Sequence, residues 1–302
     1  MISAIVRDAL IERLVSERGA GYRKTRFRER AGSSIDTSME GHAPGAAPVF
    51  IKSAPVASLD RFLAEARGLE LLAQCEAIRV PELVFVEVCA DAAVLLLEFV
   101  ELHPVGRHET RMGEALAELH GIQVPHFGLD HDNYIGATPQ RNICRDALQC
   151  KQWWHFFCDL RLQCQLELAQ YKGMTPLTIE KLRQIIQSVP GKLAHHQPPA
   201  SLLHGDLWSG NLAVDCTGKP TLFDPAVYFG DAETDIAMSK MFGALGRRVY
   251  QVYDALTEKS EGYELRQRLY DLYHWLNHFN LFGGRYLGRA EVAINELVHE
   301  LE

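Results

Sequence analysis

Residues 202–226, LLHGDLWSGNLAVDCTGKPTLFDPA, contain Asp206, Asn211 and Asp224 in that order. A His-Gly-Asp tripeptide ends at Asp206, and Asn211 follows five positions later. A Thr-Gly-Lys turn and an apolar Leu-Phe pair then lead to Asp224. Aspartate is common in turns, so Asp206 alone would carry no functional meaning. The complete spacing, His-x-Asp-x₄-Asn followed by two apolar residues and Asp, is much more specific.

These three side chains suit the transfer of a phosphoryl group to a hydroxyl. A hydroxyl is a poor nucleophile, and a carboxylate such as Asp206 aligns it and accepts its proton. Negative charge spreads over the transferred group, and Asn211 and Asp224 offer the oxygen ligands that Mg²⁺ prefers. His204 is expected to orient the loop rather than to act as the base. The spacing therefore predicts a phosphoryl-transfer site of the protein-kinase type, with Asp206 as base.

A lysine and a glutamate upstream predict the nucleotide half of such a site. Lys52 ends a short apolar strand at residues 48–52, and Glu65 lies on an amphipathic helix at residues 58–76. In kinases, a lysine on the third strand pairs with a glutamate on the next helix and holds the phosphates of ATP. Taken singly, Lys52 is as well explained by an edge strand and Glu65 by an exposed helix face. Their order upstream of Asp206 favours the kinase pair.

The order of the expected elements predicts an α+β, two-lobed, protein-kinase-like fold. A small antiparallel sheet with one main helix is expected to form an N-terminal nucleotide-binding lobe over residues 1–101. A larger, mostly helical lobe over residues 102–302 is expected to hold the catalytic and acceptor-binding groups. The backbone of Glu98, Phe99 and Val100 is predicted to form the hinge that holds adenine.

Periodicity gives the approximate position of each element. An N-terminal helix is expected at residues 2–18, and strands are expected at residues 23–30, 35–39, 48–52, 83–88 and 93–99. Helices of the second lobe are expected at residues 111–121, 153–169, 178–189, 235–242, 249–256, 265–282 and 291–301. Residues 124–141 lack a regular period, and a loop of this length is usually functional or disordered. The aromatic residues of this loop favour order.

Composition excludes several classes of protein. Of 302 residues, 47% are hydrophobic and 23% charged, as in an ordinary globular protein. The net charge of -8 argues against a nucleic-acid-binding protein, which usually presents a basic patch. Charges interrupt every apolar segment before it reaches the length of a membrane span. Seven cysteines without a CxxC pair are expected to be reduced thiols, which favours a cytoplasmic protein.

Several longer motifs resemble one family more closely than they resemble protein kinases in general. HGDLWSGN, FDPAVYFGDAETDIAMSKMFG, GLDHDNYIGATPQRN and LNHFNLFGGRYLG resemble segments of the fructosamine (ketosamine) kinase family. This family lies within the aminoglycoside phosphotransferase and choline kinase branch, and Asp-Pro-Ala in place of Asp-Phe-Gly at Asp224 agrees with that branch. The resemblance covers residues 15–290. It implies an enzyme that uses ATP and Mg²⁺ to phosphorylate the sugar 3-hydroxyl of ketosamines, the adducts of glycated amines or proteins, and so promotes their deglycation.

Carried over by position, the resemblance makes Asp206 the base and Asn211 and Asp224 the metal ligands, with Lys52 and Glu65 as the phosphate-positioning pair. It further implies an acceptor site lined by residues of the late helix, the long loop and the catalytic loop, namely His278, Asp132, Asn133, Tyr134 and Trp208. A purely structural loop and core packing of Trp208 are alternatives that the sequence leaves open.

One segment departs from the family pattern. The phosphate loop usually carries consecutive glycines, but here Gly32 stands alone before Ser33 and Ser34. Backbone N–H groups can still bind a phosphate there, and either serine can donate a hydroxyl. The preferred sugar and amine and the oligomeric state stay open. A kinase for another small alcohol or an aminoglycoside, and a non-catalytic nucleotide-binding module, are the alternatives.

Overall fold

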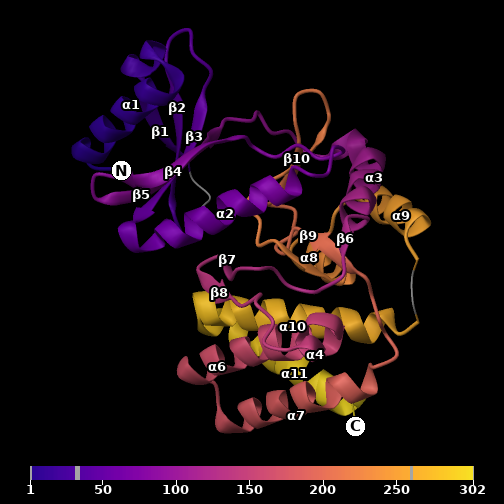
Figure 1. Cartoon of the computed structure of the whole chain (residues 1–302). Coiled ribbons are helices and arrows are strands. Elements are labelled where there is room, and N and C mark those ends of the chain that lie inside the picture. The colour runs from indigo at the N-terminus through magenta and orange to yellow at the C-terminus, as the bar shows by residue number, and fades with distance from the viewer. Residues whose placement is uncertain (1, 31–34, 259–260, 302) are drawn as a thin grey trace.

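The computed structural model describes residues 2–30, 35–258 and 261–301. Figure 1 shows an N-terminal part built on a sheet and a C-terminal part built mainly of helices. Within the described residues, the N-terminal sheet has five antiparallel strands in the order β1-β2-β3-β5-β4. They are β1 (Arg26–Arg30), β2 (Thr37–His42), β3 (Val49–Pro55), β4 (Leu83–Cys89) and β5 (Ala92–Glu98). The predicted α+β architecture is confirmed, whereas the division at residue 102 stays a prediction.

Two helices cover opposite faces of this sheet. Side chains alternate along β5, so that Leu96 packs in the cluster that includes α1 (Ala4–Arg18), and Leu95 packs in the cluster that includes α2 (Leu59–Leu72). The strand β3 lies beside β5, with Lys52 opposite Leu95. The side chain of Lys52 therefore leaves the sheet on the α2 side.

The C-terminal part combines helices with short strands (Figure 1). Its helices are α3 (Glu109–His120), α4 (Ala147–Lys151), α5 (Trp153–Phe157), α6 (Gln163–Tyr171), α7 (Pro176–Lys192), α8 (Glu233–Met241), α9 (Arg247–Leu256), α10 (Tyr263–Phe282) and α11 (Leu287–Leu301). Its strands are β6 (Gln123–Val124), β7 (Asn133–Ile135), β8 (Thr138–Gln140), β9 (Ala200–Leu203), β10 (Leu212–Val214), β11 (Pro220–Leu222) and β12 (Tyr228–Gly230). The helix α10 runs through the core, and its Leu269, Leu272 and Leu276 are fully buried.

Two expectations from the sequence differ from the structure. The single helix expected at residues 153–169 is interrupted by a π-helical turn at Cys158–Leu162, which separates α5 from α6. The segment at residues 124–141, expected to be irregular, contains the antiparallel hairpin β7–β8, in which Asn133 pairs with Gln140. Strands of three residues are too short to establish a two-residue period, so hydrophobic periodicity could not reveal this hairpin.

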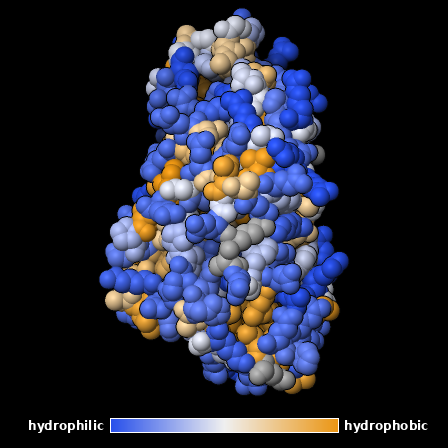
Figure 2. Space-filling view, turned by 90° about the vertical axis from the view of Figure 1, so that its right-hand side faces the viewer, coloured by the Kyte–Doolittle hydropathy of each residue, from blue (hydrophilic) through white to orange (hydrophobic). Residues whose placement is uncertain are grey.

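The surface carries no large apolar face in the view of Figure 2, where hydrophilic residues predominate and apolar ones form small groups. Among the described residues, no helix combines the length and apolar character needed to cross a membrane. All seven cysteines lie in the described part of the chain and are free thiols.

Candidate active site

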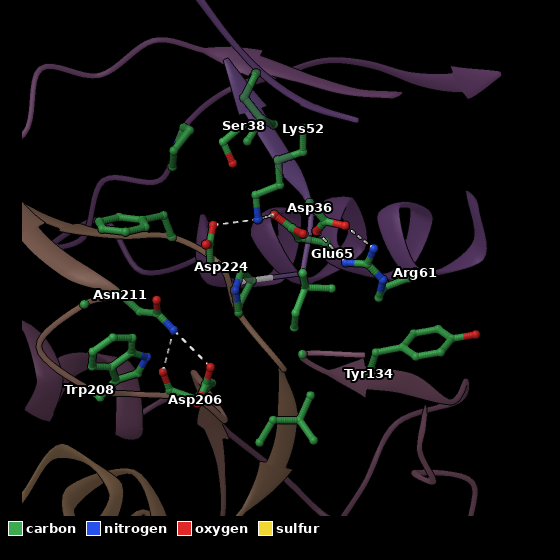
Figure 3. Close-up of a pocket in the computed structure, with 18 of the residues that line it drawn as sticks. Asp36, Ser38, Lys52, Arg61, Glu65, Tyr134, Asp206, Trp208, Asn211 and Asp224 are labelled. Atoms are coloured by element: carbon green, nitrogen blue, oxygen red, sulfur yellow. Dashed lines mark hydrogen bonds and ion pairs between the residues drawn. The ribbon is translucent and has the colours of Figure 1, made fainter. Parts of the chain in front are cut away.

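A cavity of about 720 Å³ lies between the N-terminal sheet with α2 and the C-terminal part. Figure 3 shows that side chains from both parts converge on it. Residues predicted from the sequence for catalysis, metal binding and phosphate positioning all line it, namely Lys52, Glu65, Asp206, Asn211 and Asp224. These residues span more than half of the chain, so only the tertiary fold brings them together.

The loop that carries Asp206 is fixed by backbone contacts on both sides. Gly205 has a φ of 81°, and a Cβ placed there would lie 2.0 Å from the carbonyl oxygen of Ala226, so the position requires glycine. The buried carboxylate of Asp235 accepts hydrogen bonds from the backbone N–H groups of His204 (2.7 Å) and Gly205 (2.9 Å). The loop is therefore clamped to α8.

His204 joins this loop to the segment that carries the second aspartate. Its ring is fully buried, and Nε2 donates to the carbonyl oxygen of Phe223 at 3.0 Å. Burial lowers the pKa of His204, so the ring is neutral at physiological pH. A neutral ring already bonded to the backbone orients the loop, as expected from the sequence.

Asp206 lies at the floor of the cavity and is kept from ionising easily. Burial is the main cause that raises its pKa to about 7, and the charges of Asp224 and Asp235 add to the effect. The amide of Asn211 opposes the shift, because Nδ2 donates to Asp206 Oδ2 at 3.1 Å and to its carbonyl oxygen at 2.9 Å. A carboxylate with a pKa near neutrality is well matched to accepting a proton.

Lys52 connects the two halves of the cavity. Its Nζ is 2.7 Å from Glu65 Oε1 on α2 and 2.8 Å from Asp224 Oδ1. Burial disfavours the ammonium, but the carboxylates of Asp224 and Glu65 outweigh it and hold the pKa of Lys52 above its ordinary value. Burial also raises the pKa of Glu65, while Lys52 opposes this. The lysine is therefore a fixed positive charge inside the cavity.

The second aspartate and the asparagine present oxygen atoms suited to a hard cation. Asp224 follows β11 in a left-handed conformation with a φ of 57°, and its side chain is 45% exposed. Asn211 uses its NH₂ group on Asp206, which leaves its amide oxygen to face a ligand. Phe223 N donates to the carbonyl oxygen of Asn211 at 3.1 Å and so holds the two segments together.

The residues predicted for the nucleotide are only partly placed at the cavity. Glu98 and Val100 line it, as do the apolar side chains of Phe50 and Leu97. The ring of Phe99 instead lies 6.0 Å from the ring of His42 and under the guanidinium of Arg30. The predicted phosphate-loop residues Gly32, Ser33 and Ser34 lie outside the described residues.

At the acceptor end, Trp208 and His278 line the cavity near Asp206. Phe242, which the sequence did not indicate, packs against both, with its ring 6.2 Å from Trp208 in an edge contact and stacked on His278 at 4.5 Å, although it does not line the cavity itself. His278 Nδ1 donates to the carbonyl oxygen of His274 at 2.8 Å, and burial lowers the pKa of His278. The neutral ring therefore has Nε2 as a hydrogen-bond acceptor.

The predicted acceptor residues of the long loop have different roles in the structure. Asp132 Oδ1 accepts from the backbone N–H groups of Asn142 (2.7 Å) and Ile143 (3.1 Å). Asn133 is buried and donates to the carbonyl oxygen of Val227 at 2.6 Å. Both therefore brace the hairpin, although Asn133 also borders the cavity, and Tyr134 lines it.

A salt bridge that the sequence did not predict borders the same wall. Arg61 of α2 donates from Nη1 to Asp36 Oδ2 at 2.7 Å, and both side chains line the cavity. The pair anchors the chain just after the predicted phosphate loop to α2. No spacing rule links residue 36 to residue 61, so the pair could not be recognised before the fold was known.

The chain is similar to known proteins over most of its length. The model of the fructosamine kinase family matches residues 7–300. A protein of Vibrio parahaemolyticus named probable ketoamine kinase is 40% identical over 253 residues, covering 82% of this chain and 84% of that protein. The chloroplastic protein-ribulosamine 3-kinase of Arabidopsis thaliana is 32% identical over 304 residues, covering 100% of this chain and 91% of that protein.

Solved structures show the same architecture. A protein described as a candidate fructosamine-3-kinase from Haemophilus somnus superposes with a TM-score of 0.86 at 28% identity, covering 97% of this chain and 98% of that one. An aminoglycoside phosphotransferase in complex with ADP and hygromycin B superposes with a TM-score of 0.64 at 13% identity, covering 96% and 98%. The second likeness shows the fold alone.

Proposed function

Because the chain belongs to the fructosamine kinase family, we propose that it transfers the γ-phosphoryl group of ATP to the sugar 3-hydroxyl of ketosamines, either fructosamines or ribulosamines. The observation that carries the proposal is the convergence of Asp206, Lys52 and the paired Asn211 and Asp224 on one cavity. The phosphorylated adduct then breaks down and frees the amine, so the consequence is deglycation of small amines or of protein side chains.

Each side chain has a distinct role in this reaction. Asp206 aligns the 3-hydroxyl and accepts its proton as the oxygen attacks the γ-phosphorus. Lys52 is held by Glu65 and contacts the α- and β-phosphates. These phosphates take the place of Asp224 as its second partner. The backbone at Glu98 and Val100 holds adenine. Catalysis by these residues is mainly positioning and compensation of charge.

The oxygen atoms of Asn211 and Asp224 fit Mg²⁺, and these two residues would hold it. The donor set supports this assignment, because the NH₂ group of Asn211 is already committed to Asp206 and a carboxylate and an amide oxygen remain. When bound, Mg²⁺ neutralises charge that develops on the phosphates.

The acceptor end suits a molecule that is rich in hydrogen-bond donors and carries a cationic amine. Sugar hydroxyls and the ketosamine ammonium are donors, and His278 Nε2 is an acceptor at the cavity wall. The indole of Trp208, backed by Phe242, offers a flat face to the sugar ring or to the ammonium. The carboxylate of Asp206 adds negative charge at the same end.

A coupled assay of ADP release tests the proposal. Fructoselysine and ribuloselysine are offered with ATP and Mg²⁺, beside choline, free sugars and aminoglycosides. We expect turnover of a ketosamine to exceed that of every other acceptor. The variant Asp206→Asn should lower ketosamine turnover by at least about a hundredfold. Turnover of an aminoglycoside but of no ketosamine would contradict the assigned substrate. Activity retained in Asp206→Asn would contradict the assigned base.

A further inference from the structure

The hairpin β10–β11 carries the proposed metal ligands at its open end. Asn211 precedes β10 directly, and Asp224 lies two residues after β11. Its closed end is built around Asp215, whose Oδ1 accepts from the backbone N–H groups of Thr217 (2.8 Å) and Lys219 (3.0 Å). These contacts tie the turn to Asp215, and the pairing of β10 with β11 joins this turn to both ligands.

Arg79 joins this hairpin to the predicted adenine hinge. Its Nη1 donates to Asp215 Oδ2 at 3.0 Å, and its Nη2 donates to Glu98 Oε1 at 2.5 Å. Glu98 is the last residue of β5, and its backbone N–H is bonded to the carbonyl oxygen of Glu82 at 2.8 Å. One guanidinium therefore spans the carboxylates of the hinge and of the metal-ligand hairpin.

The backbone of Arg79 is itself part of the hairpin sheet. Arg79 N donates to the carbonyl oxygen of Pro220 at 2.7 Å, and Leu222 N donates to that of Arg79 at 2.9 Å. At the far end of the hinge, His103 and Val214 exchange backbone hydrogen bonds of 2.8 and 2.9 Å. The hinge segment is thus attached at both ends to the hairpin that carries the metal ligands.

From this geometry we propose that Arg79 is a positioning residue for nucleotide binding. It fixes the distance between the adenine hinge and the ligands Asn211 and Asp224, so that adenine and the metal-bound phosphates are engaged together. The inference rests on the proposed function, because it takes the hinge and the metal ligands from there. A charge-assisted, two-pronged contact suits this role, since it fixes direction as well as distance.

The test compares Arg79→Met with a matched control, Arg13→Met. Arg13 is similarly exposed (32% against 29%), lies between the carboxylates of Glu17 and Glu87, and is on α1, away from the cavity. Calorimetry without an acceptor gives the Kd of MgATP and of adenosine for each variant. We expect Arg79→Met to weaken MgATP about tenfold, and to leave adenosine within about twofold. Arg13→Met should change neither.

Two outcomes would overturn the proposal. An equal loss of adenosine and MgATP affinity would mean that Arg79 only shapes the adenine pocket. A lower melting temperature with unchanged MgATP affinity would mean that Arg79 only stabilises the fold. Failure of the proposed function looks different, since a chain that binds MgATP as expected yet phosphorylates no ketosamine contradicts that function alone.

A second set of variants covers the case in which Arg79→Met does not fold. Glu98→Gln and Asp215→Asn keep the shape of each partner and remove one charge. Each should weaken MgATP by up to about tenfold and leave adenosine within about twofold. Because either change breaks the same bridge, the double variant Glu98→Gln/Asp215→Asn should lose less than the product of the two single losses. Full additivity of the two losses would show that the contact does not carry the effect.

Discussion

At the residue scale, the two aspartates of the cavity have different hydrogen-bond and charge partners. Asp224 is 2.8 Å from the ammonium of Lys52, so its negative charge is compensated. Asp206 has the uncharged amide of Asn211 as its partner, and burial raises its pKa to about 7. The first environment places a carboxylate beside a cation, and the second suits a base that must bind a proton during the reaction.

The raised pKa of Asp206 predicts the pH dependence of turnover. Only the carboxylate form accepts a proton, so kcat/KM for the acceptor should fall as the pH drops below about 7. Well below pH 7, kcat/KM should fall about tenfold for each pH unit, because a single ionisation controls it. Initial rates of ADP release between pH 5 and 9, at saturating ATP, measure the profile.

His278 is the control, since an imidazole near the substrate also titrates in this range. Burial lowers the pKa of His278, so its limb would fall at lower pH. The variant His278→Asn should keep the acid limb near pH 7, whatever its effect on the KM of the acceptor. Disappearance of the limb in His278→Asn would assign it to the histidine and contradict the role given to Asp206.

At the element scale, the hairpin β7–β8 is held by a buried polar network as well as by the pairing of its two short strands. Gln140 Nε2 donates to Asn133 Oδ1 (2.9 Å) and to the carbonyl oxygen of Ala226 (3.1 Å), while Tyr273 OH donates to Gln140 Oε1 (2.8 Å). The network joins the hairpin to α10 and to the segment just after Asp224. It therefore couples the proposed acceptor wall to the catalytic centre.

Replacing Gln140 with leucine should destabilise the protein and loosen this wall. The change leaves Tyr273 OH and the carbonyl oxygen of Ala226 without their partner, at about 1–3 kcal/mol for each buried group. Urea unfolding should show the lower stability, and the KM of the acceptor should rise while the KM of ATP changes little. Tyr273→Phe removes a single bond and is the matched, milder variant. Equal effects on both KM values would contradict the link to the acceptor wall.

The sequence predicted most long elements because their hydrophobic periods are clear, as in α2 and α10. It did not predict the π-helical turn between α5 and α6, which holds the fully buried Arg161. The guanidinium lies 4.0 Å from the ring of Tyr228 and donates to Asn142 Oδ1 at 2.7 Å. These partners lie on other segments of the chain, so no local sequence pattern predicts a buried arginine at this position.

The residues of the candidate site also divide into those that the sequence indicated and those that it did not. The catalytic segment is local, and its order of Asp206, Asn211 and Asp224 was readable from spacing alone. Phe242 was missed because a lone aromatic after a helix has the appearance of ordinary core packing. The bracing role of Asp132 was also invisible, since its partners are backbone N–H groups whose position depends on the fold.

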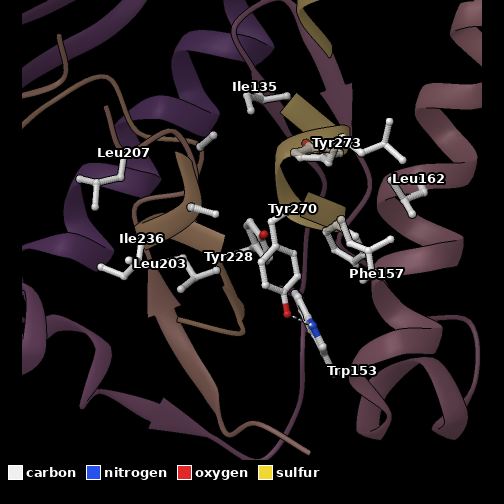
Figure 4. Packing of buried hydrophobic residues seen from close by; sticks show 14 of the residues in the cluster. Ile135, Trp153, Phe157, Leu162, Leu203, Leu207, Tyr228, Ile236, Tyr270 and Tyr273 are labelled. Carbon is white, nitrogen blue, oxygen red and sulfur yellow. Dashed lines mark hydrogen bonds between the residues drawn. The ribbon is translucent and has the colours of Figure 1, made fainter. Parts of the chain in front are cut away.

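At the scale of the whole molecule, several buried polar groups in the core of the C-terminal part are linked by hydrogen bonds. Figure 4 shows Tyr270 of α10 among apolar side chains, with its hydroxyl directed at Trp153. Trp153 Nε1 donates to Tyr270 OH at 3.0 Å, and that hydroxyl donates to Asp231 Oδ2 at 2.6 Å. The neighbouring Asp271 differs, because among the described residues its Oδ1 has no hydrogen-bond partner, and burial raises its pKa to about 7.

Asp206 and Asp271 should therefore both reduce the stability of the fold at neutral and alkaline pH. The folded pKa of each is about 7, whereas an unfolded aspartate titrates near about 3.9. Between these values the folded state binds more protons, so stability falls as the pH rises and the cost is complete above pH 7. At about 1.4 kcal/mol per pKa unit, each carboxylate costs up to about 4 kcal/mol at pH 8 and little near pH 4.

Asparagine at either position removes that cost, and the pair of variants separates stability from catalysis. Asp206→Asn and Asp271→Asn should each raise the free energy of unfolding by about 2–4 kcal/mol at pH 8 and by much less near pH 4. Asp271→Asn should keep wild-type turnover, since it lies outside the cavity lining, whereas Asp206→Asn should lose it. Urea titrations at both pH values measure the difference. A gain that is the same at pH 4 and pH 8 would show that buried charge is not its cause, and loss of turnover in Asp271→Asn would show that the two sites are coupled through α10.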